Sequence, residues 1–141
     1  MKKNLTILTL IILISYGCTK YDDGPAFSIR TKKARLTGEW ELEEIIVNGV
    51  SQALDSDYDV IWEFERNGDF TQTMDYGSYS YNYNGEWEFD DNGEELEIAS
   101  SYSGINQTYE IKRLSSNDLW LEISQSSYYG MTTVEYEFEK N

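Results

Sequence analysis

Hydrophobic and polar residues alternate along most of the chain from Leu36 onward, which is the pattern of β-strands with one buried face. The clearest stretch runs from residue 79 to residue 89, where five aromatic side chains share one parity and only polar side chains share the other. Because successive side chains of a strand point to opposite faces, the aromatic rings of this stretch would lie on one face. A helix would mix the two sets, so the pattern predicts a strand.

Seven further segments repeat the alternation, so the sequence predicts eight strands. They lie around residues 40–42 and at 58–64, 70–74, 95–98, 105–112, 119–124 and 134–139. Asn67-Gly68 and Asn92-Gly93 suit tight hairpin turns that need positive φ, and residues 48–57 are predicted to form a longer loop. Gly85 interrupts no parity, so we interpret it as a bulge or close-packing point within one strand. No segment has a convincing 3.6-residue period, so no helix is predicted.

Strands joined by turns of hairpin length predict an all-β fold, an eight-stranded antiparallel up-and-down meander that closes into a barrel. Closure removes the unpaired edges that an open meander would expose. The interior of an eight-stranded barrel is just wide enough to be filled by side chains or to hold one small ligand. A two-sheet β-sandwich is the alternative architecture.

The first eighteen residues have the features of a secretory signal peptide. Lys2 and Lys3 precede an apolar run over residues 5–14, and small residues follow just before Cys18. The run is about half of the roughly 20 residues that a membrane-spanning helix needs. The segment resembles a bacterial lipoprotein signal, which implies that Cys18 is lipidated and becomes the first mature residue. The alternative is an ordinary cysteine near a conventional cleavage site.

This resemblance divides the chain into three parts. Residues 1–17 would be the signal peptide, residues 18–34 the lipidated cysteine with a flexible tether, and residues 35–141 the barrel domain. Asp22-Asp23, shortly after the cysteine, resembles the surface-export signal of lipoproteins in Bacteroidetes-type bacteria. We therefore expect an outer-membrane lipoprotein of the bacterial cell envelope, exposed at the surface.

Composition limits the chemistry that the protein can perform. The 141 residues include 26 Asp and Glu against 11 Lys and Arg, for a net charge of −15, with no histidine and one cysteine. Catalytic triads with histidine and Cys-rich metal sites are therefore excluded, and nucleic-acid binding lacks its basic footprint. Asp55, Asp57 and Asp59 begin like an EF-hand, but Val60 and Arg66 occupy its glycine and glutamate positions. We expect a non-enzymatic protein without a cofactor or a metal.

The first predicted strand opens with Leu36-Thr37-Gly38-Glu39-Trp40, which is similar to the Gly-x-Trp start of lipocalins. Roughly residues 35–140 resemble the short lipocalin-like domain of Bacteroidetes lipoproteins. The resemblance implies that Gly38 lets the chain turn in tightly and that Trp40 plugs the closed end of the barrel. Lipocalins typically set an arginine from near the last strand against this tryptophan. No arginine follows Arg113 here, so we expect that cap to be missing or replaced.

Aromatic residues are the candidates for ligand contacts, because rings stack on sugars and line apolar pockets. The candidates are Trp62, Tyr81, Tyr83, Trp87, Tyr109, Tyr128 and Tyr129, and packing in the core is the competing role. The leading hypothesis is a membrane-anchored lipocalin-like protein that holds a small or partly apolar ligand at the barrel mouth. The alternative is an acidic lipoprotein that docks a basic protein, a contact that salt would weaken steeply.

Overall fold

The structure is a computed structural model that describes residues 31–101, 106–128 and 130–141. Cys18 and most of the predicted tether lie outside these residues. The elements in chain order are helix α2 (Lys32–Leu36) and strands β1 (Gly38–Val47), β2 (Val50–Gln52), β3 (Tyr58–Phe64), β4 (Asp69–Tyr76), β5 (Tyr79–Phe89), β6 (Glu95–Ser100), β7 (Asn106–Leu114), β8 (Asp118–Ser127) and β9 (Gly130–Lys140).

All nine strands form one antiparallel sheet in the order β2-β1-β3-β4-β5-β6-β7-β8-β9. Strand β1 also pairs with β9, with Leu42 opposite Phe138 and Val47 opposite Val134, so eight of the strands close into a barrel. This closure confirms the predicted meander and excludes the two-sheet sandwich. Strand β2 pairs with β1 alone and is the one extra strand.

Two elements were not predicted from the sequence. Strand β2 has three exposed residues within the segment that was expected to be a loop, so it carries no alternation of burial. Helix α2 is too short to show a helical period, and it begins at the Thr31 cap, whose side chain accepts from the Ala34 amide. The helix therefore begins three residues before the predicted start of the barrel domain at residue 35.

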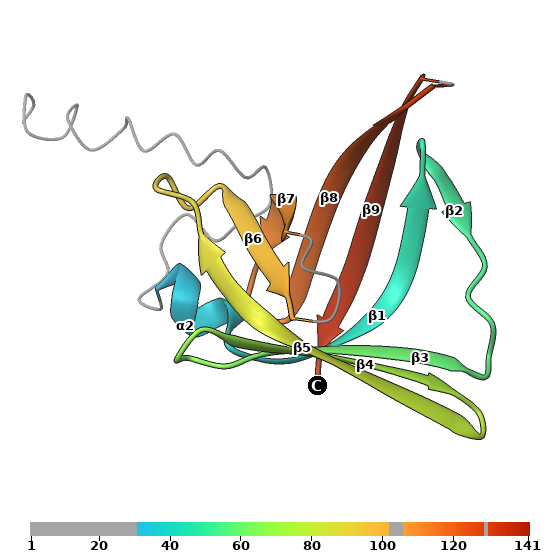
Figure 1. The fold of residues 1–141 in the computed structure, drawn as a ribbon, viewed down its shortest axis with the longest axis horizontal. Helices are drawn as coiled ribbons and strands as arrows, with labels where there is room; N and C mark the ends of the chain where they lie inside the picture. Colours follow the sequence, from blue (N-terminus) through green and yellow to red (C-terminus); the bar gives the residue numbers. More distant parts are fainter. Residues whose placement is uncertain (1–30, 102–105, 129) are drawn as a thin grey trace, which may run out of the picture.

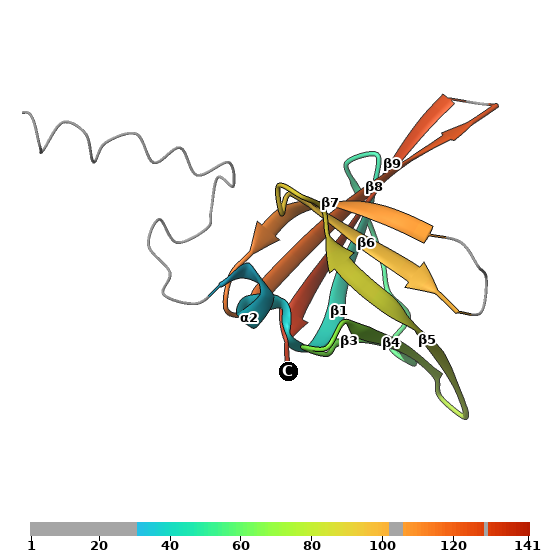
Figure 2. The same ribbon diagram turned by 60° about the vertical axis from the view of Figure 1, so that its left-hand side comes forward.

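The two ends of the barrel differ in what covers them (Figures 1 and 2). Strands β1, β4, β6 and β8 start at the end where α2 lies, and their antiparallel neighbours end there. We call this end the closed end. The β1–β2, β4–β5 and β8–β9 hairpins reach away from α2 and form the open end (Figure 1).

Inward parity matches the prediction from the sequence. In β3, Val60, Trp62 and Phe64 are buried, whereas Ile61 and Glu63 between them are only half-buried and Asp59 before them is exposed. The core as a whole contains these buried side chains: Leu36, Trp40, Leu42, Val60, Trp62, Phe64, Phe70, Trp87, Leu96, Ile98, Tyr109, Ile111, Leu114, Leu119, Leu121 and Phe138. Burial of one apolar face per strand is what fixes the register, since a shift by one residue would expose it.

Gly85 is a close-packing point within β5, as the sequence predicted. It pairs with Phe70 of β4 and with Ser100 of β6. A Cβ atom at this position would run into the backbone carbonyl oxygen of Ala99 and lie 3.1 Å from its carbonyl carbon. Only glycine lets the two strands approach this closely, so β5 continues through this position.

Glu137 on the outer face of β9 lies in a crowded row of acids. Glu44 lies directly opposite it in β1, and burial, followed by the charges of Glu135 and Glu44, raises the pKa of the Glu137 carboxyl. A raised pKa in the folded state means that stability is gained as pH falls through that pKa and lost as pH rises above it. Like charges across a strand pair also destabilise the sheet.

We therefore expect Glu137→Gln to raise the melting temperature at pH 7, by roughly 1–4 °C. The difference from the parent should shrink as pH is lowered toward 4.5, because the parent carboxyl then becomes neutral as well. Thermal melts at several pH values measure this, with Glu88→Gln as a control that removes one charge from an exposed site of β5. An equal gain for both variants would point to net charge instead of the local row of acids.

Candidate functional site

The closed end is built around Trp40, whose side chain is completely buried. Its indole Nε1 donates to the backbone carbonyl of Leu36 at 2.7 Å. Leu36 is the last residue of α2 and is also fully buried, so the short helix both covers the end of the barrel and satisfies the indole. Trp40 thus lies where the lipocalin resemblance places it.

Lys140, at the end of β9, takes the place of the arginine that lipocalins typically set against this tryptophan. Its Nζ lies 4.6 Å from the centroid of the Trp40 ring. It also donates to the carbonyls of Arg35 and Thr37, each at 2.7 Å. Gly38 has a φ of +128°, and a Cβ there would lie 2.9 Å from Lys140 Cε. The cap is therefore replaced by lysine, and Gly38 leaves the room for it.

Trp62 is the centre of an aromatic cluster inside the barrel. Its ring contacts those of Phe64, Phe70, Tyr109, Tyr136 and Phe138, with centroid distances from 4.8 to 6.2 Å. Edge-to-face and tilted pairs at such distances are favourable arrangements of aromatic rings. Three of the predicted ligand residues, Trp62, Trp87 and Tyr109, are 4–5% exposed and so belong to this packed interior.

The polar atoms of these interior residues differ in whether they have a hydrogen-bond partner. Trp87 Nε1 donates to the Glu65 carbonyl at 2.9 Å, and the Tyr109 hydroxyl donates to Gln107 Oε1 at 2.8 Å. Trp62 Nε1 is buried and finds no hydrogen-bond partner within the described segments. Burial raises the pKa of the Tyr109 hydroxyl and that of Tyr136, so both phenols stay neutral at physiological pH.

The open end carries the exposed apolar side chains. Within the described segments, the large hydrophobic residues that are exposed are Val50, Tyr76, Tyr79, Tyr81, Tyr128 and Met131. All of them lie in or beside the three hairpins that reach away from α2 (Figure 1). The most exposed are Tyr128 at 98% and Tyr79 at 69%. The hairpins of the open end, which form the rim of the barrel, therefore expose large apolar side chains.

Two more predicted ligand residues have their place near this rim. Tyr81 of β5 is exposed there, and Tyr83 is half-buried two residues farther along the strand. Tyr129 lies outside the described residues. The predicted set is thus divided between the interior and the rim and does not form one contiguous site.

An open pocket of about 690 Å³ lies at the rim, within the size range of small-molecule sites. It is lined by Asp55, Asp57, Tyr58, Tyr76, Gly77, Ser78 and Tyr79. The loop before β3 is held against the β4–β5 turn, because the Gly77 amide donates to the Asp57 carbonyl at 3.1 Å. Burial, followed by the hydrogen bond with Tyr76, raises the pKa of Tyr58 to about 12. Both walls of the pocket are therefore tied together.

The sequence did not single out Tyr58, Tyr76 and Tyr79 as ligand residues. The available signal was the position of Tyr76 and Tyr79 on either side of the Gly77-Ser78 turn, because aromatic residues at a hairpin tip have little core to enter. Tyr58 begins its strand after an acidic loop and pairs with Tyr76 across the sheet. That these three side chains lie close together can be predicted only when the strand register is known.

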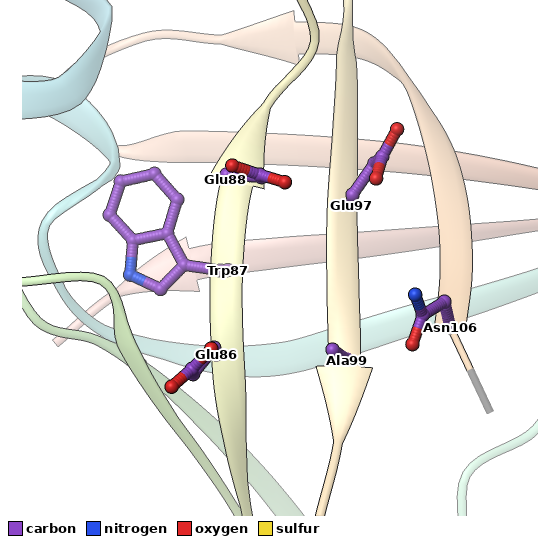
Figure 3. Close-up of a pocket in the computed structure, with 6 residues that line it drawn as sticks. All are labelled: Glu86, Trp87, Glu88, Glu97, Ala99 and Asn106. Atoms are coloured by element: carbon purple, nitrogen blue, oxygen red, sulfur yellow. The ribbon is translucent and has the colours of Figure 1, made fainter. Parts of the chain in front are cut away.

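A second, smaller pocket of about 140 Å³ lies on the outer wall of the barrel (Figure 3). It is lined by Glu86, Trp87, Glu88, Glu97, Ala99 and Asn106 from β5, β6 and β7. Figure 3 shows the Trp87 indole turned away from β6 and β7, so the polar side chains define this surface. It is separate from the interior of the barrel.

Neither a metal site nor a membrane-spanning helix is found in the parts of the chain that the structure describes. No group of three or more Cys, Asp or Glu side chains there could hold a metal ion. None of the helices in those parts is both long enough and apolar enough to cross a bilayer.

Comparison with solved structures shows the same fold in animal proteins. Lobster apocrustacyanin A1 superposes with a TM-score of 0.51 at 17% identity, over 76% of this chain and 61% of that one. Bovine odorant binding protein in complex with a selenium-containing odorant gives a TM-score of 0.51 at 15% identity, over 82% and 76%. The bovine lipocalin allergen Bos d 2 gives 0.50 at 12% identity, over 79% and 76%.

The chain spans 61% of the length of the crustacyanins that it matches. A search among curated proteins finds no match. The family profile of the lipocalin-like domain matches residues 36–121, from the last residue of α2 into β8. Since this match covers more than half of the chain and the barrel has the corresponding strand order, the chain belongs to the lipocalin-like domain family.

Proposed function

We propose that this protein is a non-enzymatic binding protein that holds a small, partly apolar ligand at the open end of the barrel. The observation that carries the proposal is the gathering of the exposed large hydrophobic side chains at that end. Several large hydrophobic side chains exposed at one end of a domain are more typical of a binding surface than of a solvated face. Eight-stranded barrels of the lipocalin type can hold one small ligand.

The test is titration of the purified protein with a neutral apolar fluorophore such as N-phenyl-1-naphthylamine. We expect saturable binding that Tyr81→Ser weakens several-fold, because Tyr81 presents a half-exposed ring at the rim. Trp120→Ser is the matched control, since it removes an aromatic ring from the outer parity of β8. Absence of saturable binding, or equal weakening by both variants, would contradict binding at the mouth.

Membrane attachment through Cys18 is part of the same proposal. The N-terminal sequence supports it, because two lysines precede an apolar run that ends shortly before the single cysteine. We expect Cys18→Ala to move the protein from the membrane fraction to the soluble fraction of cells of its own type. Thr19→Ala, at the neighbouring position, should leave it in the outer-membrane fraction. Continued membrane association of the Cys18 variant would exclude a lipid anchor at this residue.

Docking of a basic protein is the second candidate function. The outer pocket favours it, because Glu86 and Glu88 of β5 and Glu97 of β6 present three carboxylates on one face (Figure 3). Lysozyme can serve as a basic probe. If this function holds, its binding should disappear in 0.5 M salt, where the Debye length is only about 4–5 Å. It should also disappear in the triple Glu→Gln variant, which leaves the barrel mouth intact.

A further inference from the structure

The two ends of the barrel differ in their basic residues. Within the described segments, every lysine and arginine lies toward the closed end, in α2, the β3–β4 turn or the last residues of β7 and β9. They are Lys32, Lys33, Arg35, Arg66, Lys112, Arg113 and Lys140. The acids at the rim, in contrast, have no base near them in the sequence of the open-end hairpins; they are Asp55, Asp57, Asp59 and Asp75.

The rim acids are also poorly compensated within the fold. Asp59 lies directly opposite Asp75 in the β3–β4 pair, and like charges in that arrangement destabilise a sheet. Asp55 and Asp57 line the rim pocket from the loop before β3, and both are exposed. None of these four carboxylates forms an ion pair with a described residue. A cation bound in the rim pocket would offset the negative charges of Asp55 and Asp57.

The aromatic rings of the rim have the geometry to receive such a cation. The rings of Tyr58 and Tyr76 are 4.7 Å apart, and Tyr81 stands edge-on to Tyr76 at 6.2 Å. Tyr76 and Tyr79 are 47% and 69% exposed, so their faces are accessible from solvent. A cation within about 6 Å of a ring centroid is attracted by the negative face of the ring. Rings and carboxylates line the same pocket.

We propose that the open end selects an organic cation. The ammonium group of the ligand lies against Tyr76 and Tyr79 beside the carboxylates of Asp55 and Asp57, and its apolar remainder lies along the exposed apolar side chains of the open end. This inference rests on the proposed function and narrows its ligand class. The acidic rim attracts cations from solution and repels fatty carboxylates of the same tail length.

The test compares ligands that share one tail. Isothermal titration calorimetry of the purified protein, below the critical micelle concentrations, would measure dodecyltrimethylammonium, dodecanoate and the uncharged dodecyl maltoside. We expect the ammonium compound to bind at least about tenfold more tightly than dodecanoate, and its advantage to shrink as salt is raised. Equal or tighter binding of dodecanoate would overturn the inference.

Variants locate the preference. Asp55→Asn/Asp57→Asn should reduce the preference for the ammonium compound over maltoside at least about threefold. Glu86→Gln/Glu88→Gln is the control, because it removes the same charge from the outer wall. Tyr79→Leu should lower the affinity for the ammonium compound alone, since leucine keeps apolar area but has no ring face. Equal effects of the two double variants would show that net charge, and not the rim pocket, sets the preference, and would overturn the inference.

Tetramethylammonium, which has no tail, separates this inference from the proposed function. Tyrosine ring signals of the rim that shift with tetramethylammonium would support the cation site even if no tailed ligand bound. Binding of all three dodecyl compounds with equal affinity would support the proposed function and refute the cation site. No binding of any probe would refute both.

Discussion

Replacing Trp40 with alanine should lower the free energy of unfolding by about 3–5 kcal/mol, the range for removing a large buried ring. The side chain is completely buried between α2 and the end of the barrel. Its loss opens a cavity, leaves the Leu36 carbonyl without its indole donor, and removes the ring beneath the Lys140 ammonium. Since whole domains are stable by only about 5–15 kcal/mol, this single change removes a large part of the total.

Denaturant unfolding measures this loss, with Trp120→Ala as the matched control. Trp120 lies on the outer face of β8, where Arg113 stacks on its ring at 4.8 Å from the centroid. Loss of one such contact should lower the free energy of unfolding by about 1 kcal/mol or less. If the Trp40 variant is too unstable to purify, Trp40→Phe keeps a ring and still removes the hydrogen bond. Equal losses at the two positions would show that Trp40 does not hold the closed end together.

Lys140 gives the closed end a second support. Lys140→Met keeps the length of the side chain but removes both hydrogen bonds to carbonyls near the end of α2. Hydrogen bonds to charged groups contribute about 1.5–3 kcal/mol each when removed, so the loss should be clear in the same assay. The cap was foreseeable only as missing or replaced, because a lysine at the end of a strand has no local signal that it folds back over a ring.

The barrel itself was predictable because its information is local. Alternation of polar and apolar residues with a period of two fixes which face of each strand is buried, and Asn-Gly pairs mark two of the hairpins. Gly85 was predictable for the same reason, since an unbroken parity on both sides left no room for a turn. Helix α2 and strand β2 were not predictable, because five and three residues are too few to show a period.

The candidate site was predictable only in kind. Aromatic residues on the inward parity were expected to face the interior, and Trp62 and Tyr109 do so. Whether a given ring ends in packed core or at the mouth depends on its height along the barrel axis, which the strand register decides. The meeting of Tyr58 with Tyr76, and of both with Asp55 and Asp57, needs that register as well. The position of every described lysine and arginine toward the closed end likewise becomes visible only when the hairpins are assigned to an end.

The aromatic cluster inside the barrel allows a sharper experiment, because two tryptophans with the same burial differ in one hydrogen bond. Trp62 and Trp87 are each 5% exposed. Trp87 Nε1 donates to the Glu65 carbonyl, whereas Trp62 Nε1 has no partner among the described residues. A buried donor without a partner lowers stability by about 1–3 kcal/mol. The ring of Trp62 therefore stabilises the fold, whereas its unpaired N–H lowers the stability.

Substitution by phenylalanine separates the two contributions. Each Trp→Phe change removes three ring atoms, a loss of about 2–3 kcal/mol at roughly 0.8 kcal/mol per buried carbon group. At Trp62 the removal of the unpaired N–H offsets this loss, so we expect a change near zero. At Trp87 the Glu65 carbonyl loses its donor as well, so we expect a loss of about 3–5 kcal/mol. Trp62→Ala should lower the free energy of unfolding by about 3–5 kcal/mol, because the five ring contacts go with it.

The three variants are best compared by denaturant unfolding in one buffer. A Trp62→Phe variant as unstable as Trp87→Phe would mean that the Trp62 N–H is satisfied in solution, for example by water, and would contradict an unpaired donor. A near-neutral Trp62→Phe beside an unstable Trp62→Ala would show that ring packing alone keeps this tryptophan in place. Such a variant keeps an aromatic ring in the barrel wall while removing the indole N–H together with three ring atoms. If the ligand contacts this wall through a hydrogen bond, its affinity should fall with Trp62→Phe although stability does not.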